Sequence, residues 1–318
     1  MAISTVARSG LTTFDKFQRT GAGNTPATGV FILGGSQASS SAFASSADGI
    51  TWTLRSAEGF GSGRGLWKIG SAWYCMNNTG TAASSLDPIG GTSTAGGNRS
   101  AQQDANGGIS GGIYTNNGWV WWGTWGFHFN GHAWADGNTQ NFTSMVYGNG
   151  VWVAVRNGTI RYATATAEKY PGGLTFTSAT SAVTSPYRVF FDNGIFVAIG
   201  SDGIATSTDG ITWTLRSSAG DFRFSRVIFA GGLWFAGIGG GNMYTSPNAI
   251  TWTARQSLGG ANLIGAAFGA GMYVAMNQSG TIWSSPDGTT WTSRTNPVSG
   301  TNYSQDTGWQ GGSNMLFG

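Results

Sequence analysis

The stretch STDGITWTLRSS, residues 207–218, recurs along the chain and decides the fold. Three further copies are clear: SADGITWTLRS at 46–56, SPNAITWTARQS at 246–257 and SPDGTTWTSRTN at 285–296. The tryptophans of the last three copies, Trp213, Trp252 and Trp291, follow one another at intervals of 39 residues. A fixed period near 40 residues, with one strand–turn–strand phrase per period, is typical of repeat proteins whose units are arranged in a ring.

An apolar strand pair precedes each phrase. Examples are VFFDNGIFVAI at 189–199 and VIFAGGLWFAG at 227–237. The central Asn-Gly and Gly-Gly pairs suit tight turns that need positive φ, and the flanks are β-branched and aromatic, as in buried strands. Together with the more polar phrase, each period predicts four strands, which is the content of one blade of a β-propeller.

The count of periods predicts a single all-β domain over 1–318, a β-propeller of four-stranded blades. Phe176 takes the Trp position in one copy, and decayed copies near 92–103 and 134–144 fill the remaining space. We expect eight blades, with seven as the alternative. The ring is expected to close through one composite blade, formed by residues 1–18 together with 303–318. The stretch at about 75–111 departs most from the period and is expected to be a long surface loop.

The composition agrees with an all-β protein and excludes several classes. The chain has 318 residues, of which 54 are glycine, 13% are aromatic and 9% are charged, with a net charge of +3. Low charge with many aromatic residues excludes a disordered chain, and no Lys/Arg run indicates a nucleic-acid partner. No apolar stretch approaches the ~18 residues of a membrane span, and the start MAISTVARSG lacks the apolar core of a secretory signal.

The phrase Ser-x-Asp-Gly-x-Thr-Trp resembles the Asp-box, or BNR repeat, of sialidase-like propellers, with one residue fewer between Asp and Gly. The resemblance implies that Asp48, Asp209 and Asp287 are structural turn residues and that the Trp packs between blades. Physical chemistry favours the same roles, because Asp and Ser side chains bind turn backbone locally and Trp offers a large face to bury. The repeats also look similar in style to propeller proteins of tailed bacteriophages, which implies virion-associated or surface adhesion proteins.

Catalytic, cofactor and metal chemistry are not expected. The chain has only two glutamates, Glu58 and Glu168, and no marked pair of acids of the kind that a glycosidase needs. His128 and His132 are four residues apart, but a third metal ligand is missing. We therefore expect no enzyme activity, no cofactor and no metal.

Two sets of residues are candidates for ligand binding. The segment GWVWWGTWGFHFNGHAW at 118–134 predicts either strand packing or an exposed aromatic platform, with Trp122, Trp125 and His128 as its exposed members. An arginine follows the phrase Trp by three residues in every clear copy: Arg55, Arg216, Arg255 and Arg294. These arginines either cover a Trp through cation–π contacts or form a ring of anion- or sugar-binding sites.

The favoured function is a non-catalytic binding or structural protein, a bacteriophage virion or tail-associated propeller that mediates attachment. Its expected partners are capsid or tail proteins, a cell-surface glycan, or both, with no nucleic acid and no membrane insertion. Its expected location is the virion, assembled in the host cytoplasm. The alternatives are a free glycan-binding lectin, secreted or at the cell surface, and a degenerate glycosidase.

Overall fold

The protein is represented by a computed structural model of the whole chain. The residues that it describes are 29–34, 42–56, 65–69, 72–76, 82–87, 92–96, 109–115, 118–123, 126–129, 142–164, 174–218, 220, 222, 226–237, 242–257, 259, 261–298 and 315–317. Between 65 and 129 it places the backbone of the strands and, of the side chains, that of Trp73.

The described chain is all-β, with 27 strands in six four-stranded sheets and one three-stranded sheet, and every pairing is antiparallel. We number the sheets I to VII in chain order. Sheets I to III contain the following strands, in hydrogen-bonded order: β27 (Met315–Phe317), β1 (Phe31–Gly34), β2 (Ala42–Ser46) and β3 (Thr53–Ser56) in sheet I; β4 (Gly65–Ile69), β5 (Ala72–Met76), β6 (Ala82–Asp87) and β7 (Thr92–Gly96) in sheet II; β8 (Ile109–Thr115), β9 (Gly118–Gly123) and β10 (Gly126–Phe129) in sheet III.

Sheets IV to VII each contain four strands that follow one another directly in sequence. They are β11 (Ser144–Gly148), β12 (Val151–Arg156), β13 (Thr159–Thr164) and β14 (Thr177–Ser178) in sheet IV; β15 (Arg188–Asp192), β16 (Ile195–Ile199), β17 (Ile204–Ser207) and β18 (Thr214–Ser217) in sheet V; β19 (Val227–Ala230), β20 (Leu233–Gly237), β21 (Asn242–Ser246) and β22 (Thr253–Ser257) in sheet VI; β23 (Leu263–Gly269), β24 (Met272–Asn277), β25 (Ile282–Ser285) and β26 (Thr292–Arg294) in sheet VII.

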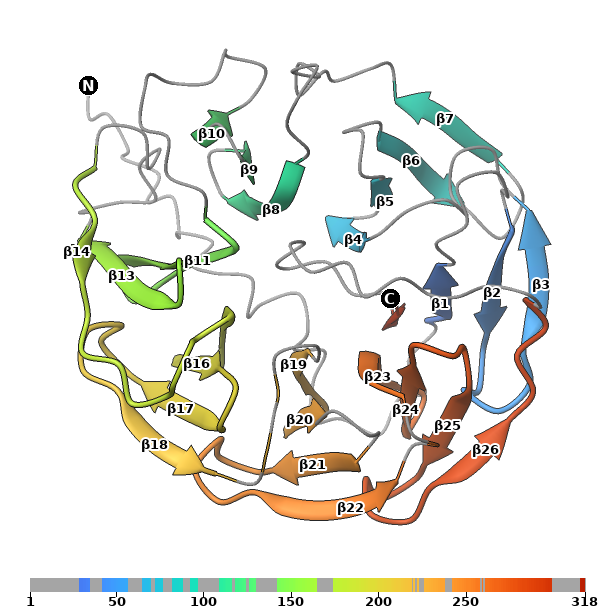
Figure 1. Cartoon of the computed structure of the whole chain (residues 1–318). Coiled ribbons are helices and arrows are strands. Elements are labelled where there is room, and N and C mark those ends of the chain that lie inside the picture. The colour runs from blue at the N-terminus through green and yellow to red at the C-terminus, as the bar shows by residue number, and fades with distance from the viewer. Residues whose placement is uncertain are drawn as a thin grey trace, which may run out of the picture.

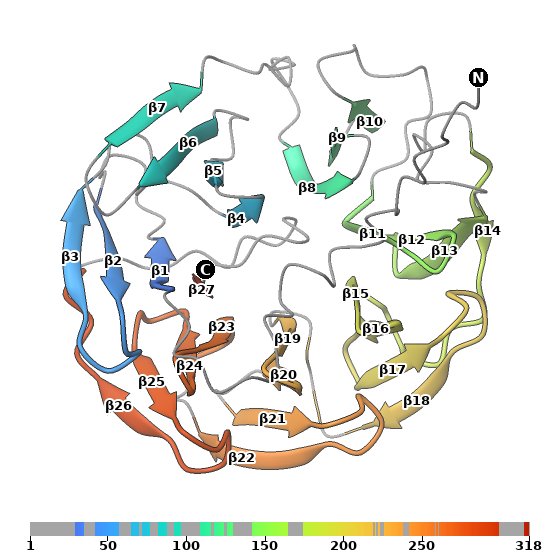
Figure 2. The ribbon, with the colours of Figure 1, turned by 180° about the vertical axis from the view of Figure 1, so that it is seen from behind.

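The sheets are arranged around a common centre, with the first strand of each near the middle and the last at the perimeter (Figures 1 and 2). The innermost strands contact one another in the order β8, β11, β15, β19, β23, β27 and β4. The tight hairpins expected from the sequence are present: Asn149-Gly150 and Asn193-Gly194 both have positive φ at the two turn residues. In sheets IV to VII the second strand of the hairpin is buried on both faces, as in β16, where four of five residues are buried.

The two ends of the described chain meet in sheet I. β27 pairs with β1, with Phe317 opposite Phe31 and Met315 opposite Leu33, and β2 and β3 complete the sheet. The expected composite sheet is therefore present with different partners. The three strands beside the C-terminal strand come from 31–56 rather than from 1–18, which lie outside the described residues. The copy around Trp52 thus belongs to the composite sheet itself, and the described residues form seven sheets where eight blades were expected.

Sheet II corrects the long loop expected at about 75–111. β6 and β7 lie inside that stretch and pair with each other, and β6 pairs with β5. These strands consist mainly of small Ala, Ser and Thr residues, and their backbone forms the same ladder as in the other units. The sequence signal that was missed is Ser85-Leu86-Asp87, which repeats Ser46-Ala47-Asp48 after one period of 39 residues.

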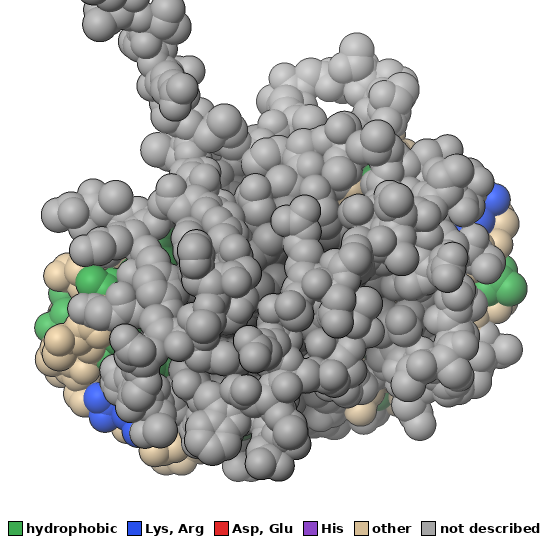
Figure 3. Space-filling view, turned by 90° about the horizontal axis from the view of Figure 1, so that it is seen from above, with side chains coloured by type: hydrophobic (Ala, Val, Ile, Leu, Met, Phe, Trp, Pro, Cys, Tyr) green, Lys and Arg blue, Asp and Glu red, His purple; other side chains and the backbone are tan. Residues whose placement is uncertain are grey.

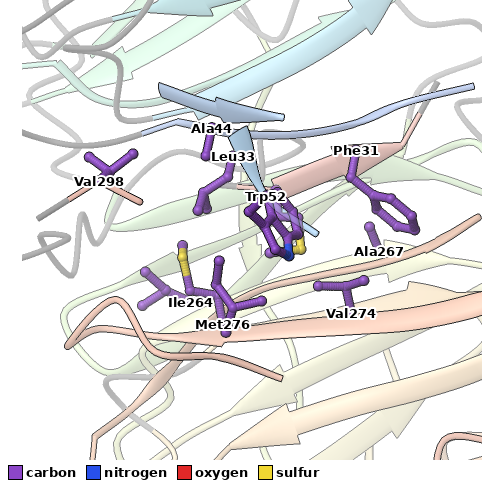
Figure 4. Close-up of a cluster of buried hydrophobic side chains, with 11 residues drawn as sticks. Phe31, Leu33, Ala44, Trp52, Ile264, Ala267, Val274, Met276 and Val298 are labelled. Carbon is purple, nitrogen blue, oxygen red and sulfur yellow. The ribbon is translucent and has the colours of Figure 1, made fainter. Parts of the chain in front are cut away.

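Apolar side chains fill the space between neighbouring sheets. Figure 4 shows the cluster between sheets I and VII, where Trp52 and Leu33 lie against Ile264, Val274 and Met276. Equivalent clusters join sheets IV and V, sheets V and VI, and sheets VI and VII. Among the described residues, no helix is long and apolar enough to cross a membrane.

Candidate functional site

Each clear copy of the repeated phrase forms a turn that its Asp or Asn side chain holds together. Oδ1 of Asp209 accepts hydrogen bonds from the backbone N–H groups of Ile211 and Thr212, both at 2.8 Å, and from the hydroxyl of Ser207 at 2.8 Å. Asp48 and Asp287 make the same three bonds in their own turns, at 2.8–2.9 Å. The structural role expected for these three aspartates matches this geometry.

The serine of the phrase closes the turn from the other side. The hydroxyl oxygen of Ser207 accepts a hydrogen bond from the N–H of Gly210 at 2.8 Å, and Ser46 and Ser285 do the same for Gly49 and Gly288. In sheet VI, Asn248 replaces the aspartate. Its Oδ1 accepts from the N–H groups of Ile250 and Thr251 at 2.9 and 3.0 Å, so the turn needs an oxygen acceptor rather than a charge.

These bonds keep the turn carboxylates ionised. Burial raises the pKa of Asp209, but the hydrogen bonds from Thr212, Ile211 and Ser207 outweigh it and lower that pKa below its usual value. The pKa of Asp48 is lowered in the same way against its own burial. For Asp287 the bond from the backbone of Thr290 is the largest cause of a lowered pKa. A general acid at neutral pH needs a raised pKa instead, so these three carboxylates are suited to holding turns.

The glycine of the turn lies against the preceding sheet. A β-carbon on Gly210 would lie 2.5 Å from Cγ2 of Val153 in sheet IV, and one on Gly49 would lie 2.7 Å from Cγ2 of Val274 in sheet VII. Gly288 approaches Leu233 of sheet VI equally closely. Each turn therefore joins neighbouring sheets as well as neighbouring strands.

Three of the four phrase tryptophans, Trp52, Trp213 and Trp291, are buried between sheets, whereas Trp252 is half-buried against the cluster of sheets V and VI. Trp213 packs with Val151 and Val153 of sheet IV, and Trp291 packs with Phe235 and Met243 of sheet VI. Trp52 takes the same place between sheets I and VII. These indoles are inside the molecule and are not available to a ligand.

The four phrase arginines share one contact, a hydrogen bond from Nε to a hydroxyl ten residues earlier in the chain. Nε of Arg216 donates to Oγ1 of Thr206 at 2.7 Å, and Nε of Arg255 donates to Oγ1 of Thr245 at 2.7 Å. The corresponding bonds of Arg55 to Ser45 and of Arg294 to Ser284 are 3.0 and 2.7 Å long. The hydroxyl acceptors were not singled out from the sequence, although their fixed spacing from the arginine is a readable signal.

The strand register explains this repeated bond. Thr206 is paired with Thr214, and Arg216 lies two residues beyond Thr214 on the outer strand β18. The same diagonal relation holds in the other three sheets, in which Thr53, Thr253 and Thr292 oppose the hydroxyl residue. An arginine two residues away on the same face is within reach of the hydroxyl.

The four arginines lie on the outer strands of four sheets that follow one another around the centre: V, VI, VII and I (Figure 1). Each arginine is half-buried, and the threonine two residues before it is exposed. Within the described residues none of the four lies over an aromatic ring, and the cation–π pair found there joins Arg188 and Tyr187. The hydroxyl bond therefore takes the place of the cation–π contact that was one expectation.

The aromatic segment lies in sheet III, where the backbone register is defined. Trp122 pairs with Phe127, and His128 pairs with Trp121. Directly paired residues belong to one face of a sheet, so Trp122 and His128 occupy positions on opposite faces. A single platform that contains both positions is not compatible with this register. Trp125 and His132 lie outside the described residues, and a ligand contact in this segment stays a prediction.

Among the described residues, no group of three His, Cys, Asp or Glu side chains lies close enough to hold a metal ion. Both glutamates lie outside them. In Figure 3 the visible Lys and Arg side chains lie at the two sides of the molecule, next to hydrophobic and other side chains. The outer strands that carry the phrase thus offer guanidinium and hydroxyl groups for hydrogen bonding, beside the exposed apolar side chains of Leu54 and Leu215.

The fold and these turns define a repeat protein of the β-propeller class. No model of a known protein family matches the sequence, and no curated protein matches it. The chain is similar in structure to the propeller YCF48 from Cyanidioschyzon merolae, with 17% identity, 74% of this chain and 87% of that chain covered, and a TM-score of 0.50. YCF48 bound to D1 peptide gives 15% identity, 71% and 79% coverage, and a TM-score of 0.51.

A second similar structure is the extracellular domain of a putative one-component system from B. thetaiotaomicron, with 12% identity and a TM-score of 0.54. The match covers 75% of this chain but only 34% of that one, so the chain spans about a third of its length. Likeness at these identities shows the fold alone.

Proposed function

We propose that this protein is a non-catalytic binding protein built on a closed propeller of seven blades. The seven sheets, and the pairing of β27 with β1, support the blade number and the closure of sheet I. In this proposal sheets II and III complete the ring by contact between β4 and β8. The turns then belong to the Asp-box type, shortened by one residue.

The proposal of binding rests on the four phrase arginines, Arg55, Arg216, Arg255 and Arg294, which we call the arginine row. The aspartates of the phrase are engaged by turn backbone and its tryptophans by the core. On the outer strands of four consecutive sheets the phrase presents one half-buried arginine and one exposed threonine, with the exposed side chains of Leu54 and Leu215 between them in sheets I and V. A scaffold that presents one polar pair repeatedly suits recognition of a repetitive target, because weak sites act together.

The setting that we propose is a bacteriophage virion or tail, in which the propeller attaches to capsid or tail proteins, to a cell-surface glycan, or to both. Its support is the similarity in style between these repeats and those of tailed-phage propellers. The alternatives are a free glycan-binding lectin and a degenerate glycosidase.

The test combines binding with turnover. Purified full-length protein is applied to an array of neutral and acidic glycans. Each glycan that binds is then incubated with a high concentration of the protein, and released sugar is measured. We expect binding without release of any sugar. Detectable catalytic release would contradict the non-enzyme proposal. Co-sedimentation with purified phage particles separates the virion setting from a free lectin, which would stay in the supernatant.

A further inference from the structure

The four arginines of the row have one of their five N–H donors assigned within the described residues. Each guanidinium carries five N–H donors, and the Nε donor is used by a Ser or Thr hydroxyl in every case. Within the described residues, the Nη groups have neither a hydrogen-bond acceptor nor a carboxylate partner. What remains is the end of the fork, the Nη1–Nη2 edge.

We propose that these Nη1–Nη2 edges of Arg216, Arg255, Arg294 and Arg55 form a row of four sites for the acidic groups of a repeating polysaccharide, each taking one carboxylate or sulfate end-on. The inference rests on the proposed binding function and names the class of its ligand. In this proposal the four sites form one continuous surface along the outer strands β18, β22, β26 and β3.

The hydroxyl bond prepares the arginine for this role. A guanidinium binds an oxyanion through two parallel N–H bonds, either at its side through Nε and one Nη or at its end through both Nη groups. Because Nε is engaged, the side-on mode is occupied and the end-on mode remains. The same bond restricts the long side chain, so less rotamer entropy is lost when a ligand binds.

In the part of the chain that the structure describes, the partner of Nε leaves the charge of each arginine without a carboxylate beside it. Ser45, Thr206, Thr245 and Ser284 are neutral hydroxyl residues that are themselves buried. The four arginine residues are half-buried, and a charge at the protein surface attracts an anion more strongly than a fully hydrated cation does. A bound anion would stabilise the guanidinium of a half-buried arginine that has no counter-charge beside it.

The neighbours of the row favour an acidic sugar polymer over a nucleic acid. An exposed threonine hydroxyl lies two residues from every arginine and can bond to sugar hydroxyls. Three of the four sheets also carry a turn carboxylate, Asp48, Asp209 or Asp287, whereas sheet VI has the neutral Asn248. A duplex with one charge per ~1.7 Å would meet these carboxylates, whereas a polymer with one acid per repeat unit can match single arginines.

The experiment measures binding of full-length protein to three immobilised polymers: polygalacturonate, dextran sulfate and neutral dextran. We expect binding to the carboxylate or the sulfate polymer and none to dextran. Exchange of one arginine for glutamine should weaken binding about tenfold. The variant with Arg→Lys at 55, 216, 255 and 294 keeps its net charge, but its binding should be weaker by more than about 100-fold. Arg156→Lys is the matched control outside the row and should change affinity less than about twofold.

The hydroxyl acceptors supply a second readout that keeps every charge in place. Thr206→Val removes the acceptor of Arg216 at nearly constant volume, and Thr206→Ser restores it. We expect a several-fold loss for Thr206→Val and recovery for Thr206→Ser, with unfolding midpoints measured for both variants. Equal affinity of the two would overturn the positioning role of Thr206.

The outcomes distinguish a failure of the polysaccharide inference from a failure of the proposed binding function. Unchanged binding by the fourfold lysine variant, no binding to either acidic polymer, or tighter binding to single-stranded DNA of equal charge would each overturn the acidic-polysaccharide row. If one of these results is obtained but the protein still binds other glycans or phage particles, the proposed binding function stays intact. Absence of binding to every glycan and every particle would overturn both.

Discussion

Phe31 and Phe317 lie opposite each other in the ladder between β1 and β27, and their ring centroids are 4.7 Å apart. Gly269 of sheet VII lies against the same Phe317 ring, just as Gly148 lies against Phe191 and Gly231 against Phe268 between other neighbouring sheets. Phe317 therefore occupies the place that Phe191 takes in the first strand of sheet V and Phe268 in the first strand of sheet VII. The hairpin that opens sheet I is assembled from the two ends of the chain.

Removal of residues 315–318 should lower the free energy of unfolding by about 3 kcal/mol or more. The deletion takes away Met315, which is fully buried, and it leaves the inner edge of β1 unpaired. Urea unfolding of the truncated and complete chains measures the difference. Removal of Gly318 alone is the control and should change stability by less than about 0.5 kcal/mol. Equal stability of the shortened chain would contradict the closing role of β27.

Asp209→Ala should destabilise the protein by about 1 kcal/mol, and Asp209→Asn by much less. Alanine leaves the N–H groups of Ile211 and Thr212 without their acceptor, although these exposed groups can turn to water. Asparagine keeps the acceptor, as Asn248 does in sheet VI. Chemical denaturation of both variants tests the comparison, and a larger loss for asparagine than for alanine would show that charge holds the turn.

Stability should fall in acid because of the turn aspartates. Their pKa values are lower in the folded protein than the ordinary 3.8, so the unfolded chain binds more protons in this range. Their contribution is complete above about pH 5 and is lost as the pH falls below about 4, toward the lowered values. Urea unfolding between pH 2 and pH 6 measures this slope. In Asp209→Asn the slope should be smaller, and an unchanged slope would remove Asp209 from this account.

Gly210→Ala and Gly194→Ala should separate packing from backbone strain. Both glycines have φ near +75°, at 73° and 75°, so each substitution carries a strain of about 1 kcal/mol. A β-carbon at 194 meets nothing within 4 Å, whereas one at 210 lies 2.5 Å from Cγ2 of Val153. Gly210→Ala should therefore cost about 1–3 kcal/mol more, measured by thermal or chemical unfolding. Equal losses would mean that the sheets adjust freely around the turn.

The repeated phrase made much of the fold predictable. Period, turn chemistry and alternation are local properties, so the all-β class, the four strands of a unit and the burial of Trp213 follow from the residues. The decayed units were harder. Sheet II has Ser85 and Asp87 at the expected spacing but no Trp or Arg after them, so the decayed copy was placed near 92–103 and a long loop was expected where β6 and β7 lie.

The candidate site divides in the same way. The arginines at 55, 216, 255 and 294 were found because they repeat, but their partners were not, since a Ser or Thr ten residues earlier means nothing until two strands are paired. The grouping of Trp122 with His128 was suggested by their nearness in sequence. A hairpin reverses that inference, because its register puts the two positions on opposite faces.

By itself the sequence determined the repeat and the turn with its Ser and Asp, because these depend on contacts within a few residues of one another. Tertiary structure alone decided which segments share sheet I. The pairing of Met315–Phe317 with Phe31–Gly34 is a contact between segments of three and four residues at opposite ends of the chain. Segments so short carry little pattern of their own, and their place is fixed by the exposed edge and the apolar space that neighbouring sheets leave for them.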